Sequence, residues 1–259
     1  MRKIWMALLI LFVSMLFAPA GPRAQWRTRW SYDDAAADGP AHWAQLDPEY
    51  AACSGKEQSP IDIRDARKAD LPPLRFEYKS GPLTIINNGY TAVRVNYPKG
   101  NGNFLFVGGQ RYELVQFHFH RPSEEQIDGK PYDMVLHLMH QSSDGKVVGV
   151  AVLLKAGGPN AAFETVVQQL WKYMPEKAGA QQLIPGVQVD PAALLPRNTS
   201  YYMYQGSQTA PPCTEGVTWF VLKTPMSISP EAINAFAKIY PHDVRPVQPL
   251  NGRVVEESE

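Results

Sequence analysis

The stretch QFHFHRPSE, residues 116–124, places two histidines two positions apart between two phenylalanines. In a β-strand successive side chains point to opposite faces, so His118 and His120 share one face while Phe117 and Phe119 share the other. A single histidine is more often a solvated or hydrogen-bonded side chain than a ligand. Two imidazoles on one face can converge on one metal ion, so this stretch predicts a strand that carries two metal ligands.

A third ligand is offered by the stretch DMVLHLMHQ, residues 133–141. Alternation puts His137 and His140 on opposite faces of this expected strand, so either one can join the site, but not both. Three neutral imidazoles leave the fourth position of a tetrahedral zinc ion open to water, which is typical of a catalytic rather than a closed structural site. The two stretches together therefore predict a catalytic zinc centre.

Short strand-like runs recur between turn signals along the 259 residues. Helical patterns are few: residues 161–174 are amphipathic, and residues 229–240 begin with an N-cap serine followed by proline. We therefore expect a single mainly β domain with short helices packed outside it. The expected strand runs are PLTII (82–86), AVRVNY (92–97), FLFV (104–107), YELVQFHFH (112–120), MVLHLMH (134–140), VVGVAVLLK (147–155) and VTWFVLK (217–223).

The overall charge is balanced. Lys plus Arg and Asp plus Glu each number 25, so the formal net charge is zero. This balance gives no indication of a nucleic acid or another polyanion as a partner. A hydrophobic content of 44% with 19% charged residues is typical of an ordinary globular protein.

The N-terminal segment is typical of an export signal. Two basic residues precede an apolar run over residues 4–17, and small residues then fit cleavage after Ala20. The alternative is a transmembrane anchor, which needs about 20 apolar residues, and this run is shorter. We therefore expect a signal peptide (1–20) and one domain (21–259) that is periplasmic or secreted.

Cys53 and Cys213 are the only cysteines. In an exported chain an even number of cysteines favours a disulfide, and two buried free thiols are the alternative. A bridge between them would close a long loop and stabilise the fold by about 2–4 kcal/mol.

Two families combine a His-x-His pair with a nearby glutamate. Cupins are one, and Glu124 fits their first motif, but nothing around His137 supplies their second. The rest of the chain resembles the α-class carbonic anhydrases in their shorter, exported bacterial form. Seven motifs in the family's order carry this resemblance: GPAHW (39–43), GKEQSPIDI (55–63), IINNGY (85–90), QFHFHRPSE (116–124), LHLMH (136–140), YQGSQTAPPCTEGVTWFVLK (204–223) and RPVQPLNGR (245–253).

The resemblance implies a large twisted, mostly antiparallel central β-sheet and a carbonate dehydratase. Such an enzyme hydrates carbon dioxide reversibly to bicarbonate and a proton by means of a zinc-bound hydroxide. The implied cofactor is one Zn²⁺ per chain. The implied partners are carbon dioxide and bicarbonate, with no nucleic acid and no membrane after signal cleavage; a homodimer is left open. Two alternatives remain, a carbonic anhydrase-like binding module with decayed catalysis and a zinc-hydroxide esterase.

The resemblance also assigns roles to individual residues. Thr209 matches the threonine that accepts a hydrogen bond from the zinc-bound hydroxide, and Glu124 matches the glutamate that accepts from this threonine. His140 matches a structural histidine. The remaining matches are His118, His120 and His137 as zinc ligands, Gln116 as the partner of the first ligand, Met139, Val217 and Trp219 as the apolar wall for carbon dioxide, and Cys53 with Cys213 as the disulfide pair.

Four positions depart from the family's pattern. Val135 stands where a glutamate orients the third zinc histidine, Gln208 where a leucine lines the substrate pocket, and Ala210 where a second threonine lies near zinc. Tyr90 stands at the position of the proton-shuttle histidine. Metal-bound histidines nearly always donate their other N–H, so Val135 predicts weaker zinc binding unless another group substitutes. Glu125 matches no motif role and is expected to be a solvated surface charge.

Overall fold

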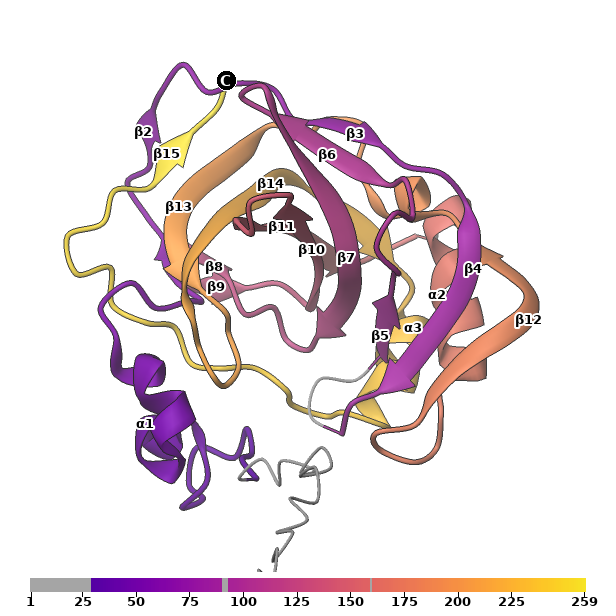
Figure 1. Cartoon of the computed structure of the whole chain (residues 1–259), viewed down its shortest axis with the longest axis horizontal. Helices are drawn as coiled ribbons and strands as arrows, with labels where there is room; N and C mark the ends of the chain where they lie inside the picture. Colours follow the sequence, from indigo (N-terminus) through magenta and orange to yellow (C-terminus); the bar gives the residue numbers. More distant parts are fainter. Residues whose placement is uncertain (1–28, 90–92, 159) are drawn as a thin grey trace, which may run out of the picture.

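A large mixed β-sheet dominates the computed structural model, which describes residues 29–89, 93–158 and 160–259 (Figure 1). Two sheets are formed within these residues, one of twelve strands and one of three. The strands are β1 (Asp62–Ile63), β2 (Arg67–Lys68), β3 (Arg75–Glu77), β4 (Gly81–Asn87), β5 (Val93–Asn96), β6 (Phe104–Val107), β7 (Gln110–His120), β8 (Gln126–Ile127), β9 (Lys130–Pro131), β10 (Met134–Ser142), β11 (Val147–Ala156), β12 (Gln181–Val189), β13 (Tyr201–Ser207), β14 (Glu215–Ile228) and β15 (Glu256–Glu257).

The order of the large sheet places β7 and β10 near its middle. The strands follow the order β12-β4-β5-β7-β10-β11-β14-β13-β15-β2, and β6 pairs with both β3 and β7. Most pairs are antiparallel, and the parallel pairs of this sheet are β11 with β14 and β15 with β2. The three-stranded sheet has the order β1-β8-β9. The expected fold class, a mainly β domain on a large twisted and mostly antiparallel sheet, is confirmed.

Each strand run that the sequence predicts corresponds to a strand of this sheet: β4, β5, β6, β7, β10, β11 and β14. Strands β12 and β13 were not predicted. Pro185 and Gly186 interrupt the β12 sequence, and the pairing of β12 with β4 shifts register between Leu183 and Gln188. This irregular edge strand has no alternating apolar pattern, so sequence periodicity could not reveal it.

The helices are short and lie outside the sheet. They are the α-helices α1 (Trp43–Leu46), α2 (Ala161–Tyr173) and α3 (Pro230–Ala237), with the 3₁₀ helices η1 (Pro40–His42), η2 (Pro48–Ser54) and η3 (Pro191–Leu194). Ser229 caps α3 as expected, because its side chain accepts a hydrogen bond from the backbone N–H of Ala232. The Trp171 indole of α2 donates to the Ala232 carbonyl at 3.0 Å and so joins the two longer helices. Figure 1 shows α2 and α3 on the side of the molecule away from α1.

The two faces of β7 and β10 contribute to different environments. Phe117, Phe119, Leu136 and Leu138 are fully buried in the larger hydrophobic core, which also takes the apolar faces of α2 and α3. The opposite face carries the histidine pair beside a smaller apolar cluster around Trp219. The alternation predicted from residues 116–124 is therefore the property that separates the core from the site.

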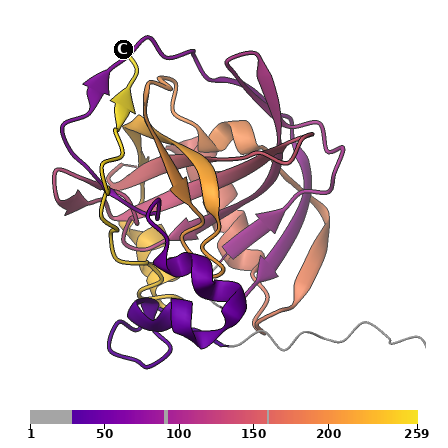
Figure 2. The same ribbon diagram turned by 60° about the vertical axis from the view of Figure 1, so that its left-hand side comes forward.

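A disulfide ties the N-terminal helical segment to the turn between β13 and β14. Cys53 and Cys213 are bonded with an S–S distance of 2.03 Å across a sequence separation of 160 residues. Tyr32, Trp43 and Tyr50 pack around the bridge. Figure 2 shows this indigo segment against one end of the sheet. The predicted pairing is confirmed, and the long loop it closes is the case in which chain-entropy stabilisation is large.

Two sequence predictions fall outside the described residues. These are the signal peptide at residues 1–20 and the placement of Tyr90. Within the residues that are described, no helix has both the length and the apolar character required to cross a bilayer.

Candidate active site

Three histidines come together on neighbouring strands. His118 and His120 lie on β7, and His137 lies directly opposite His118 on the antiparallel strand β10. Side chains directly opposite each other in such a pair point to the same face. One ring nitrogen from each of the three lies within 4.8 Å of the others, so a single metal ion could bridge them.

The other candidate histidine, His140, faces the opposite side of the sheet. Its Nε2 atom is hydrogen-bonded to the Tyr78 hydroxyl, and the two rings are stacked. Burial lowers the pKa of His140 to about 3, so the ring is neutral. The choice that alternation alone left open is resolved: His137 joins the cluster, and His140 is a packed core residue.

Each clustered histidine hydrogen-bonds through one ring nitrogen to a fixed acceptor. His118 Nδ1 lies 2.8 Å from Gln116 Oε1, and His120 Nδ1 lies 2.7 Å from the Asp243 carbonyl oxygen. Because these acceptors cannot donate, the hydrogen resides on Nδ1 and the lone pair resides on Nε2. The expected pairing of Gln116 with the first histidine is therefore present in the structure.

Glu125 fixes the third histidine. His137 Nε2 donates to both Glu125 carboxylate oxygens, at 3.0 and 3.1 Å, which leaves Nδ1 with the lone pair. Glu125 is 0% exposed, so the expectation of a solvated surface charge was wrong. Its backbone is held in place by Ser123, whose hydroxyl donates to the Glu125 carbonyl at 2.6 Å and accepts from the Tyr132 N–H at 2.8 Å.

Because Glu125 accepts from His137, the valine at position 135 does not leave this histidine without an acceptor. Val135 is fully buried in the smaller apolar cluster, two residues before His137 on the same face of β10. The glutamate that the family places at this position is missing, and Glu125, in the turn before β8, is the acceptor instead. The inference that zinc is held less tightly because of Val135 therefore loses its physical basis.

Glu124 lies beneath the three histidines. Its Oε1 atom accepts from the Arg245 backbone N–H at 2.9 Å, and the Thr209 side chain lies close enough to lower the pKa of this carboxyl. Its Oε2 atom lies 3.4 Å from His120 Nε2 and 3.8 Å from His137 Nδ1. Burial raises the pKa of Glu124 to about 7; the charge of His137 opposes this rise, the charge of Glu125 adds to it, and Arg245 and Thr209 oppose it more weakly. A cation at the histidines would favour the ionised carboxylate.

The unsatisfied atoms of this cluster fit a metal ion. His120 Nε2, His137 Nδ1 and Glu124 Oε2 are buried and have no hydrogen-bond partner within the described part of the chain. Buried polar atoms are rarely left unpaired, because losing water without a replacement partner is unfavourable. A divalent cation bound by the free imidazole nitrogens would satisfy the ring atoms and offset the nearby negative charge. Three nitrogen donors with converging lone pairs suit zinc.

The pKa shifts of two of the three histidines agree with metal binding. Burial lowers the pKa of His118 and of His120, and the proximity of the other imidazoles lowers it further. Burial also acts to lower the pKa of His137, but the charge and hydrogen bond of Glu125 outweigh it and raise the pKa. Ligand imidazoles must be neutral at the coordinating nitrogen, so His118 and His120 are prepared for metal binding in this respect.

A cavity of about 380 Å³ opens in front of the histidines. Val217 is buried behind the cavity in the apolar cluster of Met139 and Trp219 and does not line it. Val93 is buried in the larger core, whereas the next residue, Arg94, lines the cavity. The lining comprises Trp30, Tyr50, Asn88, Arg94, Gln116, His118, His120, His137, Met139, Gln208, Thr209, Ala210, Pro211, Pro212 and Trp219.

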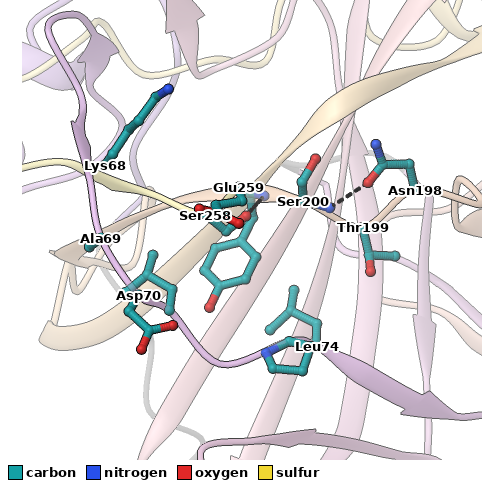
Figure 3. A pocket seen from close by; sticks show the side chains of 12 residues that line it. Lys68, Ala69, Asp70, Leu74, Asn198, Thr199, Ser200, Ser258 and Glu259 are labelled. Atoms are coloured by element: carbon teal, nitrogen blue, oxygen red, sulfur yellow. Dashed lines mark hydrogen bonds between the residues drawn. The ribbon is translucent and has the colours of Figure 1, made fainter.

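Another cavity, of about 530 Å³, lies near the C-terminal strand (Figure 3). It is lined by backbone and side chains around Lys68, Asp70, Asn198, Ser200 and Ser258. None of its lining residues is a histidine, and none is a candidate site residue. The chemistry therefore belongs to the smaller cavity at the histidine cluster.

Comparisons with known proteins agree on one family. A model described as eukaryotic-type carbonic anhydrase matches residues 38–259. A carbonic anhydrase from a Nostoc species is 38% identical over 253 residues, covering 95% of this chain and 91% of the relative, and one from Klebsiella pneumoniae is 42% identical over 238 residues, covering 91% and 94%. The solved α-carbonic anhydrase of Thermovibrio ammonificans, in complex with the inhibitor sulfanilamide, superposes with a TM-score of 0.81 at 40% identity, covering 90% of this chain and 99% of that one.

The fold and the site define an enzyme built on a large mixed sheet with three histidines at its centre. The chain belongs to the eukaryotic-type carbonic anhydrase family. Its reaction is the reversible hydration of carbon dioxide to bicarbonate and a proton.

Proposed function

We propose that this reaction takes place at one zinc ion held by His118 Nε2, His120 Nε2 and His137 Nδ1. The observation that carries the proposal is the convergence of three imidazoles whose other ring nitrogens are engaged by Gln116, Asp243 and Glu125. Zinc bound in this way would supply a water that ionises near neutral pH, as is established for carbonic anhydrases. The residues of the chain would then bind the zinc ion, orient the attacking group and form an apolar surface for carbon dioxide.

Thr209 and Glu124 form the orienting pair. The Thr209 hydroxyl has one hydrogen, and we expect it to give this hydrogen to the nearby Glu124 carboxylate. Its oxygen, which belongs to the cavity lining, can then only accept a hydrogen bond from what lies in the cavity. A fixed acceptor next to the metal would select one orientation of an attacking O–H group and so lower the orientational part of the barrier.

Met139 and Trp219 provide the apolar side of the cavity. Both line it, and the Trp219 ring centroid lies 4.7 Å from that of His137. The Trp219 N–H donates to the Ser207 carbonyl at 2.9 Å, so the ring is fixed in place. Carbon dioxide has no charge to bind, and an apolar surface next to the metal suits it. Gln208 and Ala210 also line the cavity: Gln208 adds a polar side chain where the family has a leucine, whereas Ala210 removes the hydroxyl of a threonine.

A stopped-flow assay combined with metal analysis tests the proposal. The purified protein is expected to contain about one zinc per chain and to hydrate carbon dioxide. Hydrolysis of an activated ester without hydration would favour the zinc esterase. One zinc per chain with neither reaction would favour the binding module. Full hydration by a metal-free preparation would overturn the proposed site.

We also propose that the mature protein is exported and that residues 1–20 are removed. The Cys53–Cys213 disulfide supports this, because such bonds persist mainly in oxidising compartments. The charged and apolar pattern of the N-terminus supports it independently.

Proton release is expected to be slow and to depend on buffer. In the sequence, Tyr90 stands where the family has its proton-shuttle histidine, and a phenol with a pKa of about 10 is already protonated at neutral pH, so it cannot readily take another proton. Turnover should therefore rise with the concentration of a small imidazole buffer. Tyr90→His should raise kcat and weaken this dependence while kcat/KM changes little, because attack on carbon dioxide precedes proton transfer. Fast turnover at low buffer concentration, unchanged in Tyr90→His, would show that another group acts as the relay.

A further inference from the structure

Arg94 is a cation in the active-site cavity. It lies on β5, and its residue partner on β7 is His118, so the two side chains point to the same face. Arg94 lines the cavity together with Gln116, His118 and Gln208. The sequence motifs assign it no role.

The guanidinium is held from one side only. Arg94 Nε donates to Asn96 Oδ1 at 2.7 Å, and the Asn96 amide in turn donates to Gln181 Oε1 at 2.9 Å. This chain of polar contacts runs from the cavity toward β12 and fixes the Nε edge of Arg94. Among the described residues, the two terminal nitrogens have no hydrogen-bond partner.

The charge of Arg94 is not compensated. Within the described residues no carboxylate lies within ion-pair distance of it. Burial lowers the pKa of Arg94, and no acidic side chain acts in the opposite direction. Placing a cation beside a site for a divalent metal is unfavourable unless an anion joins them. The cavity thus has the electrostatic character of an anion site.

We propose that Arg94 is an anion-binding subsite of this cavity, and that it takes a small planar oxyanion, a carboxylate or bicarbonate. A guanidinium with two free terminal nitrogens matches two oxygens of such an ion with a pair of parallel hydrogen bonds. Gln208, which stands where the family has a leucine, adds another hydrogen-bonding side chain to the same cavity. For bicarbonate as the product, the inference rests on the proposed function, whereas the Arg94 contact itself does not require zinc.

Acetate is the probe that tests the subsite. Its dissociation constant can be measured from the broadening of the ¹³C resonance of labelled acetate on addition of the zinc-loaded protein, and again with the metal-free protein. Arg94→Gln, which keeps a polar side chain of similar reach, is expected to weaken acetate binding about tenfold or more, because a charge-assisted pair is lost. Arg94→Lys should recover part of the affinity, since it restores the charge without the planar fork.

Arg111→Gln is the matched control. Arg111 is exposed on β7 and lies over the Phe104 ring, away from the cavity lining, so its loss should leave acetate binding unchanged. Bicarbonate inhibition of the hydration reaction should weaken in Arg94→Gln in parallel with acetate binding. Acetate affinity within twofold of wild type in Arg94→Gln would overturn the subsite. Wild-type affinity in Arg94→Lys would overturn its two-oxygen geometry.

The two proposals can fail separately. If the wild-type protein binds no zinc but Arg94→Gln still loses acetate binding, the proposed catalytic site is wrong and the subsite holds. If zinc content and hydration are normal and Arg94→Gln binds acetate as wild type does, the subsite alone is wrong.

Discussion

His118→Ala is expected to abolish zinc binding and carbon dioxide hydration together. The substitution removes one of three nitrogen donors, and His120 and His137 cannot complete a three-ligand site on their own. Zinc affinity should fall by more than the roughly 10–100-fold that is typical for the loss of a group that only supports a ligand. The measurements are metal content by mass spectrometry and the hydration rate by stopped flow.

His42→Ala is a suitable control for this experiment. His42 is exposed and belongs to η1, away from the cluster, so zinc content and rate should be those of the wild type. Because His118 lies on a central strand, a circular dichroism spectrum must show that the variant is folded. A folded His118→Ala protein that keeps one zinc per chain and its activity would mean that the metal is held elsewhere.

Where the site lies on regular strands, sequence periodicity was sufficient to predict which face of the strand each residue takes. The pair His118 and His120 is separated from Phe117 and Phe119 by the alternation of side chains alone, and the structure buries both phenylalanines in the larger core. Pairing between strands is not encoded in such a local pattern. The choice between His137 and His140 therefore needed either a family resemblance or the register of β7 against β10.

The residues that sequence reasoning missed act through non-local geometry. Glu125 lies beside another glutamate in a turn, and nothing in its neighbourhood marks which of the two carboxylates turns inward. Both do: Glu124 Oε2 lies 3.8 Å from His137 Nδ1, and the Glu125 carboxylate accepts from His137 Nε2. Valine at position 135 did indicate that another group must accept from His137, but the position of that acceptor in the sequence could not be calculated from spacing. The sequence left Val93 and Arg94 as alternatives for the cleft, because the chain is one residue longer than the family after Tyr90, and the structure decides for Arg94.

Glu125 supplies the acceptor for His137 that is missing at Val135, so a substitution of Glu125 should have a large effect. Glu125→Gln is expected to weaken zinc binding by about 10–100-fold and to speed zinc loss to a chelator. The charge of the carboxylate holds His137 with Nε2 protonated and Nδ1 free, and a neutral amide fixes this tautomer less strongly. The carboxylate also offsets part of the charge of the cation. A zinc release rate in Glu125→Gln equal to that of the wild type would show that His137 needs no carboxylate.

A glutamate at position 135 should slow zinc release only in a background where Glu125 has been replaced. Sequence alone predicts that Val135→Glu tightens zinc binding, but the structure reverses this expectation, because Glu125 already occupies His137 Nε2 and Val135 is fully buried. The single variant would bury a third carboxylate beside Glu124 and Glu125, so its thermal midpoint should fall. In Glu125→Gln the His137 Nε2–H would meet only a neutral amide, so Val135→Glu could offer it a carboxylate acceptor and should there slow zinc release again. The decisive measurement is the chelator-driven release rate of all four proteins: a double variant that releases zinc as fast as Glu125→Gln would show that position 135 cannot reach His137 in this fold, and that Glu125 has no interchangeable counterpart.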